Sequence, residues 1–344
     1  MPSQPPLPPL LAPYLSAQPE ASLTLVSSIL GATSNWLTLR FLHASLSTSS
    51  NLNASLGLGE SHNGSKKVVL VSFLRGWEFW RAEAKRLGLD LARLADKKQF
   101  AFVDGLSELF SAPQTVNAMP SVPSIASGPT RTSLPFRSQP GAVPGRGPPS
   151  AAPALAMNND NLARSQTEQG IVKKLHFSGR GIAALDALER DIASVIQLQK
   201  SSMEDGEELL LIIDQPDFLL AATGPVMGIG ATEMAEWVSG LQQHVHATIV
   251  TLAADSPLIH NASTSGHQMA TPVESEHAAF AISLAHRARS VMQLRTLETG
   301  AARDVSGVLR ISRGGGADDS VEERELLYYI QRDGGLSVFG RGES

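Results

Sequence analysis

The stretch Glu208-Leu209-Leu210-Leu211-Ile212-Ile213-Asp214-Gln215-Pro216-Asp217-Phe218 decides the fold of this chain. Its five consecutive large aliphatic residues predict a strand that is buried on both faces, because a half-exposed strand would alternate polar and apolar residues. Pro216 has no N–H group to donate to a sheet, so we expect the strand to end near Asp214. An acid at the carboxyl end of a central parallel strand lies where α/β sheets bind their ligands. Asp214 is therefore the first candidate for a functional residue.

Other apolar runs without alternation predict further buried strands, and apolar residues at helical spacing predict helices between them. The predicted strands cover residues 23–26, 68–74, 100–105 and 247–252, and the predicted helices cover 36–46, 77–87, 90–95, 182–196, 231–244 and 277–286. Strand-like runs at 290–297, 307–312 and 325–332, with 336–339 as a short partner, close the chain. This order predicts an α/β fold: a central, mainly parallel sheet flanked by helices, with an antiparallel C-terminal flank. The layout matches the RecA-like core of P-loop NTPases.

The prolines divide the chain into regions. Residues 1–19 are Pro-rich and predict a disordered leader. Residues 111–169 lack periodicity and are rich in Pro, Ser and Gly, which predicts a disordered insertion. Because the strand and helix pattern resumes in the same style after this insertion, residues 20–340 are predicted to form a single RecA-like domain.

Composition excludes several classes of protein. The 344 residues carry a net charge of -5, are 42% hydrophobic and include no cysteine, which excludes disulfides and thiolate metal sites. The nine histidines form no metal-binding signature, so we expect neither a metal nor another cofactor. No apolar run is long enough to cross a bilayer. We therefore expect a soluble protein without membrane contact, in the cytoplasm and also in the nucleus.

The turn after the first strand is where a P-loop NTPase would bind phosphate. A Walker A loop needs a lysine after its second glycine and a Ser or Thr hydroxyl for Mg²⁺. With Gly31, Ala32 and Thr33 in the place of Gly-Lys-Thr, Ala32 replaces the lysine, and no lysine occurs before Lys66. The turn is thus a degenerate Walker A motif, and we do not expect this chain to hydrolyse NTP by itself.

The same reasoning decides how we interpret Asp214. It stands at the Walker B position, where an aspartate would hold Mg²⁺. A strand-end aspartate also commonly caps a turn or the next helix by accepting backbone N–H bonds, and Asp217 could serve equally. Asp104 has the same two interpretations with less support. Without the lysine, a structural role for Asp214 is favoured. An active RecA-like ATPase that acts on its own remains the alternative.

Two glycine clusters suggest a dinucleotide site, and with it an oxidoreductase. Residues 179–184 read Gly-Arg-Gly-Ile-Ala-Ala and fit G-x-G-x-x-A, but the fingerprint needs an acid about 20 residues further on inside a tight βαβ unit. The nearest strand-end acid, Asp214, comes 30 residues after Ala184. In the second cluster, residues 228–230, Glu233 stands where a third glycine belongs and would repel phosphate. Glycine turns that open helices are the favoured interpretation of both clusters.

The basic residues are concentrated between Lys66 and Lys98, where nine basic side chains stand against four acidic ones. Arg81 and Lys85 share a helix face by their i,i+4 spacing, and Arg86 follows. A solvated helix face is the default interpretation. Arg81, Lys85 and Arg86 are also candidate contacts to RNA or to an acidic partner.

Three segments resemble a known family. They are VLVSFLRGWEFW at residues 69–80, FVDGL at 102–106 and LIIDQPDFLLA at 211–221. Together they are similar to the fungal Elongator complex protein 6 family, and the likeness covers about residues 20–110 and 170–340. Asp-Gln-Pro-Asp with its apolar flanks is the most specific part.

The resemblance implies a RecA-like fold without working Walker motifs, in agreement with the lysine-free first turn. It also implies two paralogous partners, the fourth and fifth Elongator proteins, in a hetero-hexameric ring. That ring binds tRNA and belongs to Elongator, which modifies the wobble uridine at C5 through a different, iron–sulfur subunit. By resemblance, this chain is a structural and regulatory subunit without catalytic residues, and any ATPase activity belongs to the assembled ring.

Overall fold

A computed structural model describes residues 7–16, 18–51, 66–111, 172–259, 270–297, 303–316, 321–332 and 334–340. The predicted insertion lies outside these residues apart from Ser111, so its predicted disorder stays a prediction. All described residues belong to one unit of the chain.

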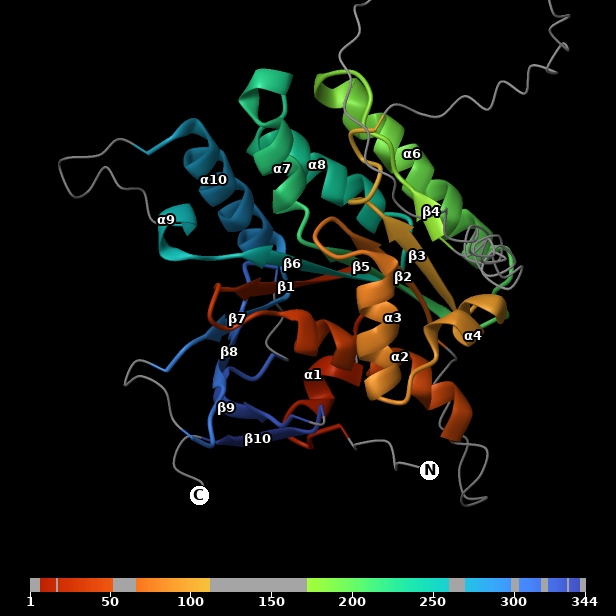
Figure 1. The fold of residues 1–344 in the computed structure, drawn as a ribbon, viewed down its shortest axis with the longest axis vertical. Helices are drawn as coiled ribbons and strands as arrows, with labels where there is room; N and C mark the ends of the chain where they lie inside the picture. The colour runs from red at the N-terminus through yellow and green to blue at the C-terminus, as the bar shows by residue number, and fades with distance from the viewer. Residues whose placement is uncertain are drawn as a thin grey trace, which may run out of the picture. The chain divides into compact units, whose positions relative to one another are not determined.

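One sheet runs through the whole unit (Figure 1). Within the described residues it has ten strands in the order β10-β9-β8-β7-β1-β6-β5-β2-β3-β4. The strands from β7 to β4 are parallel to their neighbours, whereas β8, β9 and β10 are added in antiparallel pairs. Their bounds are β1 Ser22–Ser28, β2 Lys66–Ser72, β3 Phe100–Asp104, β4 Val172–Lys174, β5 Glu208–Asp214, β6 Ala247–Ala253, β7 Ser290–Arg295, β8 Gly307–Arg313, β9 Arg324–Ile330 and β10 Leu336–Gly340. The predicted α/β class with an antiparallel C-terminal part is confirmed.

Helices cover both faces of the sheet (Figure 1). On one face pack α6 (Gly181–Lys200), α7 (Asp217–Thr223), α8 (Ala231–Gln242) and α10 (Pro272–Arg287). The other face is covered by α1 (Ala12–Ser16), α2 (Asn35–Asn51), α3 (Trp77–Arg86) and α4 (Leu91–Asp96). A 3₁₀ turn, η1 (Pro225–Met227), and a short helix, α9 (Ser256–Ile259), lie in the connections.

The central strand β5 explains why the sequence contains five aliphatic residues in a row. Leu209, Leu211 and Ile213 pack into the core beneath α6, α8 and α10. Leu210 and Ile212 point the other way and pack beneath α1 to α4. Because side chains alternate along a strand, burial on both faces requires an apolar residue at every position.

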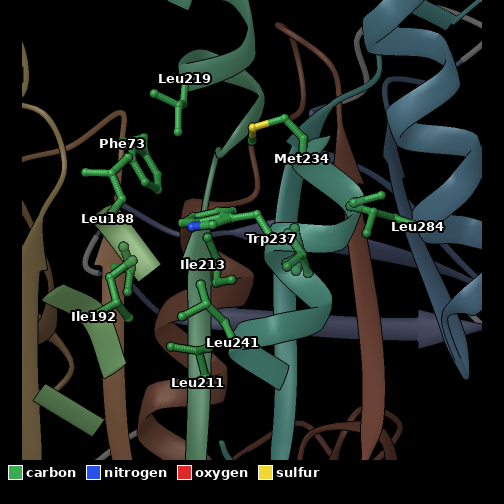
Figure 2. Close-up of a cluster of buried hydrophobic side chains, with 14 of the residues drawn as sticks. Phe73, Leu188, Ile192, Leu211, Ile213, Leu219, Met234, Trp237, Leu241 and Leu284 are labelled. Carbon is green, nitrogen blue, oxygen red and sulfur yellow. The ribbon is translucent and has the colours of Figure 1, made fainter. Parts of the chain in front are cut away.

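Trp237 lies on α8 and packs against the sheet. Its side chain is only 2% exposed and meets the ring of Phe73 edge-on, with ring centroids 6.0 Å apart. Figure 2 shows it over β5 among the side chains of α6 and α8. Trp237 therefore belongs to the core.

The chain also folds in places that the sequence did not predict. Residues 7–16 fall within the predicted leader, yet Leu11 and Leu15 are fully buried against α2, so this part belongs to the folded unit. The edge strand β4 was missed because it has only three residues, two of them lysines. Residues 1–6 and residue 17 lie outside the described part.

Candidate functional site

Asp214 joins three neighbouring strands at their carboxyl ends. Its Oδ2 accepts a hydrogen bond from Ser72 Oγ at the end of β2 (2.8 Å), and its Oδ1 accepts one from Thr251 Oγ1 on β6 (2.9 Å). The strand order β6-β5-β2 places these hydroxyls on either side of the carboxyl group. The residue is 0% exposed, so both oxygens are enclosed by the protein.

The surroundings of Asp214 change its acidity. Burial raises the pKa of the carboxyl group from 3.8 to about 6, because a charged group loses its hydration in the interior. The hydrogen bonds from Ser72 and Thr251 and the charge of Arg75 oppose this rise in pKa, whereas the nearby Asp217 adds to it. Asp214 is therefore a buried acid that ionises between mildly acidic and neutral pH.

Gln215 turns the chain directly after this carboxyl group. It is buried and has a φ of 55°, in the left-handed region that non-glycine residues rarely adopt. Its backbone N–H donates to the carbonyl oxygen and to Oγ1 of Thr251, both at 3.1 Å, which holds the strained conformation in place. The turn sets Asp217 at the start of α7.

Asp217 connects the end of β6 with α10 at the same edge of the sheet. Its Oδ2 lies 3.2 Å from the donor N–H of Ala253 and 3.3 Å from Nε2 of His277. His277 Nδ1 lies 3.2 Å from the carbonyl oxygen of Leu258. We did not single out His277 from the sequence; its position among the apolar residues of α10, three before Phe280, is the only signal of its burial.

Asp104, the third strand-end acid, closes a turn. Its Oδ1 accepts hydrogen bonds from the N–H groups of Leu106 and Ser107, both at 2.9 Å. Asp104, Asp214 and Asp217 thus all accept hydrogen bonds that stabilise the ends of strands or the turns after them.

The turn after β1, which the sequence predicts to be a degenerate Walker A motif, is short. Ile29 and Ala32 bridge it, with Ala32 N donating to Ile29 O at 2.9 Å. Gly31 and Thr33 are exposed, whereas Ala32 is buried. The backbone N–H of Leu30 donates to Asp255 Oδ1 at 3.0 Å, so a carboxylate already occupies this donor.

Carboxylates also occupy the N-terminus of α8, next to the second glycine cluster. Gly230 N donates to Glu233 Oε2 (2.9 Å), and Ala231 N donates to Glu276 Oε2 of α10 (2.6 Å). Helix N-termini attract anions, and here the anions come from the chain itself.

The two glycine clusters lie against each other. A Cβ on Gly181 would come within 3.6 Å of the carbonyl oxygen of Gly228, and both residues have positive φ. The strand before the first cluster, β4, is separated from β5 by β3 and β2, so the cluster is not part of a tight βαβ unit. This geometry fits glycine turns that let two loops approach closely.

The basic residues between Lys66 and Lys98 do not form one patch. Lys66 and Lys67, at the start of β2, pair with Glu208 and Glu207 at the amino end of the sheet. On α3, Arg81 pairs with Glu78 (2.7 Å) and Arg86 with Glu83 (3.1 Å), while Lys85 is exposed. Arg81, Lys85 and Arg86 thus lie on one helix, together with the acids Glu78 and Glu83. Whether they contact tRNA stays a prediction.

In the part of the chain that the structure describes, no three His, Asp or Glu side chains gather in a way that could hold a metal ion. No helix in these ranges is long and apolar enough to cross a membrane.

Comparison with known proteins adds no relative to this picture: the chain matches no family model and no curated protein.

Proposed function

We propose that this chain is a non-catalytic structural and regulatory subunit of the Elongator complex with a RecA-like fold. It assembles with two paralogous RecA-like subunits into a hetero-hexameric ring that binds tRNA and supports C5 modification of the wobble uridine. The chemistry belongs to the catalytic Elongator subcomplex. The resemblance of residues 69–80, 102–106 and 211–221 to the Elongator complex protein 6 family motivates the proposal.

The fold and the first turn support it. A mainly parallel sheet flanked by helices, with antiparallel strands toward the C-terminus, is consistent with a RecA-like domain. Ala32 stands where a Walker A loop has its lysine. A RecA-like domain without this point charge lacks the group that contacts the β- and γ-phosphates of a nucleotide.

The observation that carries the proposal is the enclosure of Asp214. A Walker B aspartate must present an oxygen toward Mg²⁺. Here both carboxylate oxygens accept hydrogen bonds from Ser72 and Thr251, and the residue has no exposed surface. This arrangement favours a role in joining strands over a role in catalysis.

The carboxylates that accept hydrogen bonds from Leu30 and from the start of α8 also support a non-catalytic role. Backbone N–H groups at such positions bind phosphate in nucleotide-binding proteins. In this chain these N–H groups donate to carboxylates of the chain itself, namely Asp255, Glu233 and Glu276. Their negative charge would repel a phosphate. The chain is thus better suited to assembly than to holding a nucleotide by itself.

Native mass spectrometry of the full-length chain, purified under mild conditions from its own cells, tests the assembly. We expect a complex that contains two copies of this chain and two copies of each of two RecA-like paralogues. A chain that remains monomeric and brings down no RecA-like partner would overturn the proposal.

An ATPase assay separates the proposal from an ATPase that acts alone. We expect the isolated chain to show no Mg²⁺-dependent ATP turnover above background. Turnover that Asp214→Ala abolishes would instead establish the alternative, provided that the variant keeps the wild-type circular dichroism spectrum.

A further inference from the structure

Arg75 is held in a fixed position at the carboxyl edge of the sheet. It follows β2, and its backbone N–H donates to Ser72 Oγ (3.1 Å), the same hydroxyl that donates to Asp214. Its Nε donates to Asn35 Oδ1 at the start of α2 (3.2 Å), and its guanidinium carbon lies 4.6 Å from the centroid of the Phe79 ring. The hydrogen bond and the cation–π contact fix the plane of the guanidinium group.

The outer nitrogens of Arg75 are available. Across the residues that the structure describes, no carboxylate forms an ion pair with Arg75, and its only side-chain hydrogen bond uses Nε. The nearby acids have other partners: Glu78 pairs with Arg81, Asp104 closes its own turn, and Asp214 is enclosed. Because Nε is engaged by Asn35, the edge formed by the two terminal nitrogens remains, and this edge matches a carboxylate in bidentate geometry.

Exposed apolar side chains follow the strands at either side. In the strand order β5-β2-β3, the loop that carries Arg75 stands between the segments that follow β5 and β3. Phe218 (46% exposed) lies in the first turn of α7, after β5, and Leu106 (44% exposed) lies in the turn after β3. Ser72 O accepts a hydrogen bond from Gly105 N, and Phe73 N donates to Asp214 O, so the three loops are connected directly.

We propose that Arg75 is the anchor at which a partner subunit docks a carboxylate side chain, with Leu106 and Phe218 as the apolar contacts around it. The inference deepens the proposed ring function and rests on it. An ordered arginine among apolar side chains is typical of residues that dominate the binding energy of an interface. The acids along this edge, Asp104, Asp214 and Asp217, disfavour a multiply charged phosphate more than a single carboxylate.

The test uses the full-length chain and the two RecA-like paralogues that co-purify with it, and measures the dissociation constant at low and high salt. We expect Arg75→Gln to weaken binding at least 10-fold and to reduce its salt dependence, because a charged pair at the interface is lost. Arg75→Lys keeps the charge but not the bidentate geometry, so it should restore only part of the affinity. Arg93→Gln is the matched control: Arg93 is exposed on α4, before β3, and should leave binding within twofold.

The outcomes separate the two proposals. Binding of Arg75→Gln within twofold of wild type, with the ring still formed, would overturn the docking role and leave the ring intact. Failure of the wild-type chain to bind RecA-like partners would overturn both. Binding of ATP to the isolated wild-type chain but not to Arg75→Gln would make this a phosphate site and would also overturn the docking role. Thermal melting of each variant, expected to match wild type, shows that the change in binding is not a loss of folding.

Discussion

Ser72 Oγ lies 2.8 Å from Oδ2 of Asp214, although the two residues are 142 positions apart in the chain. The contact joins the carboxyl ends of β2 and β5, and Thr251 extends it to β6. In a P-loop NTPase, the acid at this position serves a metal and a nucleotide. In this chain Asp214 accepts hydrogen bonds from the two neighbouring strands. Its burial has measurable consequences for stability.

Asp214 should make stability depend on pH. Folding raises the pKa of this acid from 3.8 to about 6, so the folded chain retains a proton that the unfolded chain releases. Its contribution to stability is therefore full below about pH 4 and is lost as the pH rises through about 6. From about pH 5 to about pH 8, the linkage relation gives a loss of about 1 kcal/mol.

Urea denaturation at these two pH values, in wild type and in Asp214→Asn, measures this loss. The asparagine does not titrate, so the variant should lack this part of the pH dependence. Subtracting the pH dependence of the variant from that of the wild type removes the contribution of the other ionisable groups, which both proteins share. Equal pH dependence in both would show that Asp214 ionises as freely in the folded chain as in the unfolded one.

Trp237 should contribute to stability and not to partner binding. Trp237→Ala removes a large buried side chain beside Phe73 and should cost roughly 3–5 kcal/mol of unfolding free energy. Trp237→Phe keeps an aromatic ring, and the indole N–H has no hydrogen-bond partner in the described structure, so it should cost much less. Chemical denaturation measures both variants. A Trp237→Ala protein that is as stable as wild type but no longer binds its partners would contradict this prediction and assign Trp237 to an interface.

Glu276 should act as an internal anion at the start of α8. Glu276→Ala removes the acceptor for Ala231 N and should cost about 1 kcal/mol, as losing an N-terminal cap does. Because one of the two carboxylates at this helix end is then gone while Glu233 remains, inorganic phosphate should stabilise this variant slightly more than wild type. Melting temperatures with and without phosphate measure the effect.

Glu236→Ala is the control for Glu276→Ala, because Glu236 is an exposed acid on α8 itself. It should change stability little and should not increase the response to phosphate. An identical phosphate response in all three proteins would mean that Glu276 does not occupy an anion site.

The basic residues on α3 can be tested in the ring that we propose. Replacing Arg81, Lys85 and Arg86 with Gln should weaken tRNA binding and flatten its salt dependence, because fewer phosphate counterions are released. Replacing Arg93, Lys97 and Lys98 removes the same charge from exposed residues before β3, and should have a smaller effect. Filter binding over a range of salt concentrations gives both slopes. Equal slopes for the two variants would assign the α3 residues to a solvated face.

The sequence by itself determined the fold class and the position of most strands. Hydrophobic spacing is local: residues 209–213 predict burial on both faces whatever lies next to them, and Pro216 ends the strand. Short elements carry too little of this signal, so β4 and α1 were missed. That alanine, and not lysine, follows Gly31 was also visible, because it depends only on residue identity.

Only the tertiary structure decided what Asp214, Trp237 and Arg75 contact. Ser72 and Thr251 meet Asp214 because β2 and β6 pair with β5 in one particular register, which no local pattern specifies. Trp237 shares the apolar face of α8 with Met234, Val238 and Leu241, but only the packed structure shows that its ring meets Phe73. Arg75 is ordered by Asn35 and Phe79, which belong to two different helices. The chemistry of this edge follows from contacts between segments distant in sequence, and these form only when the whole sheet assembles.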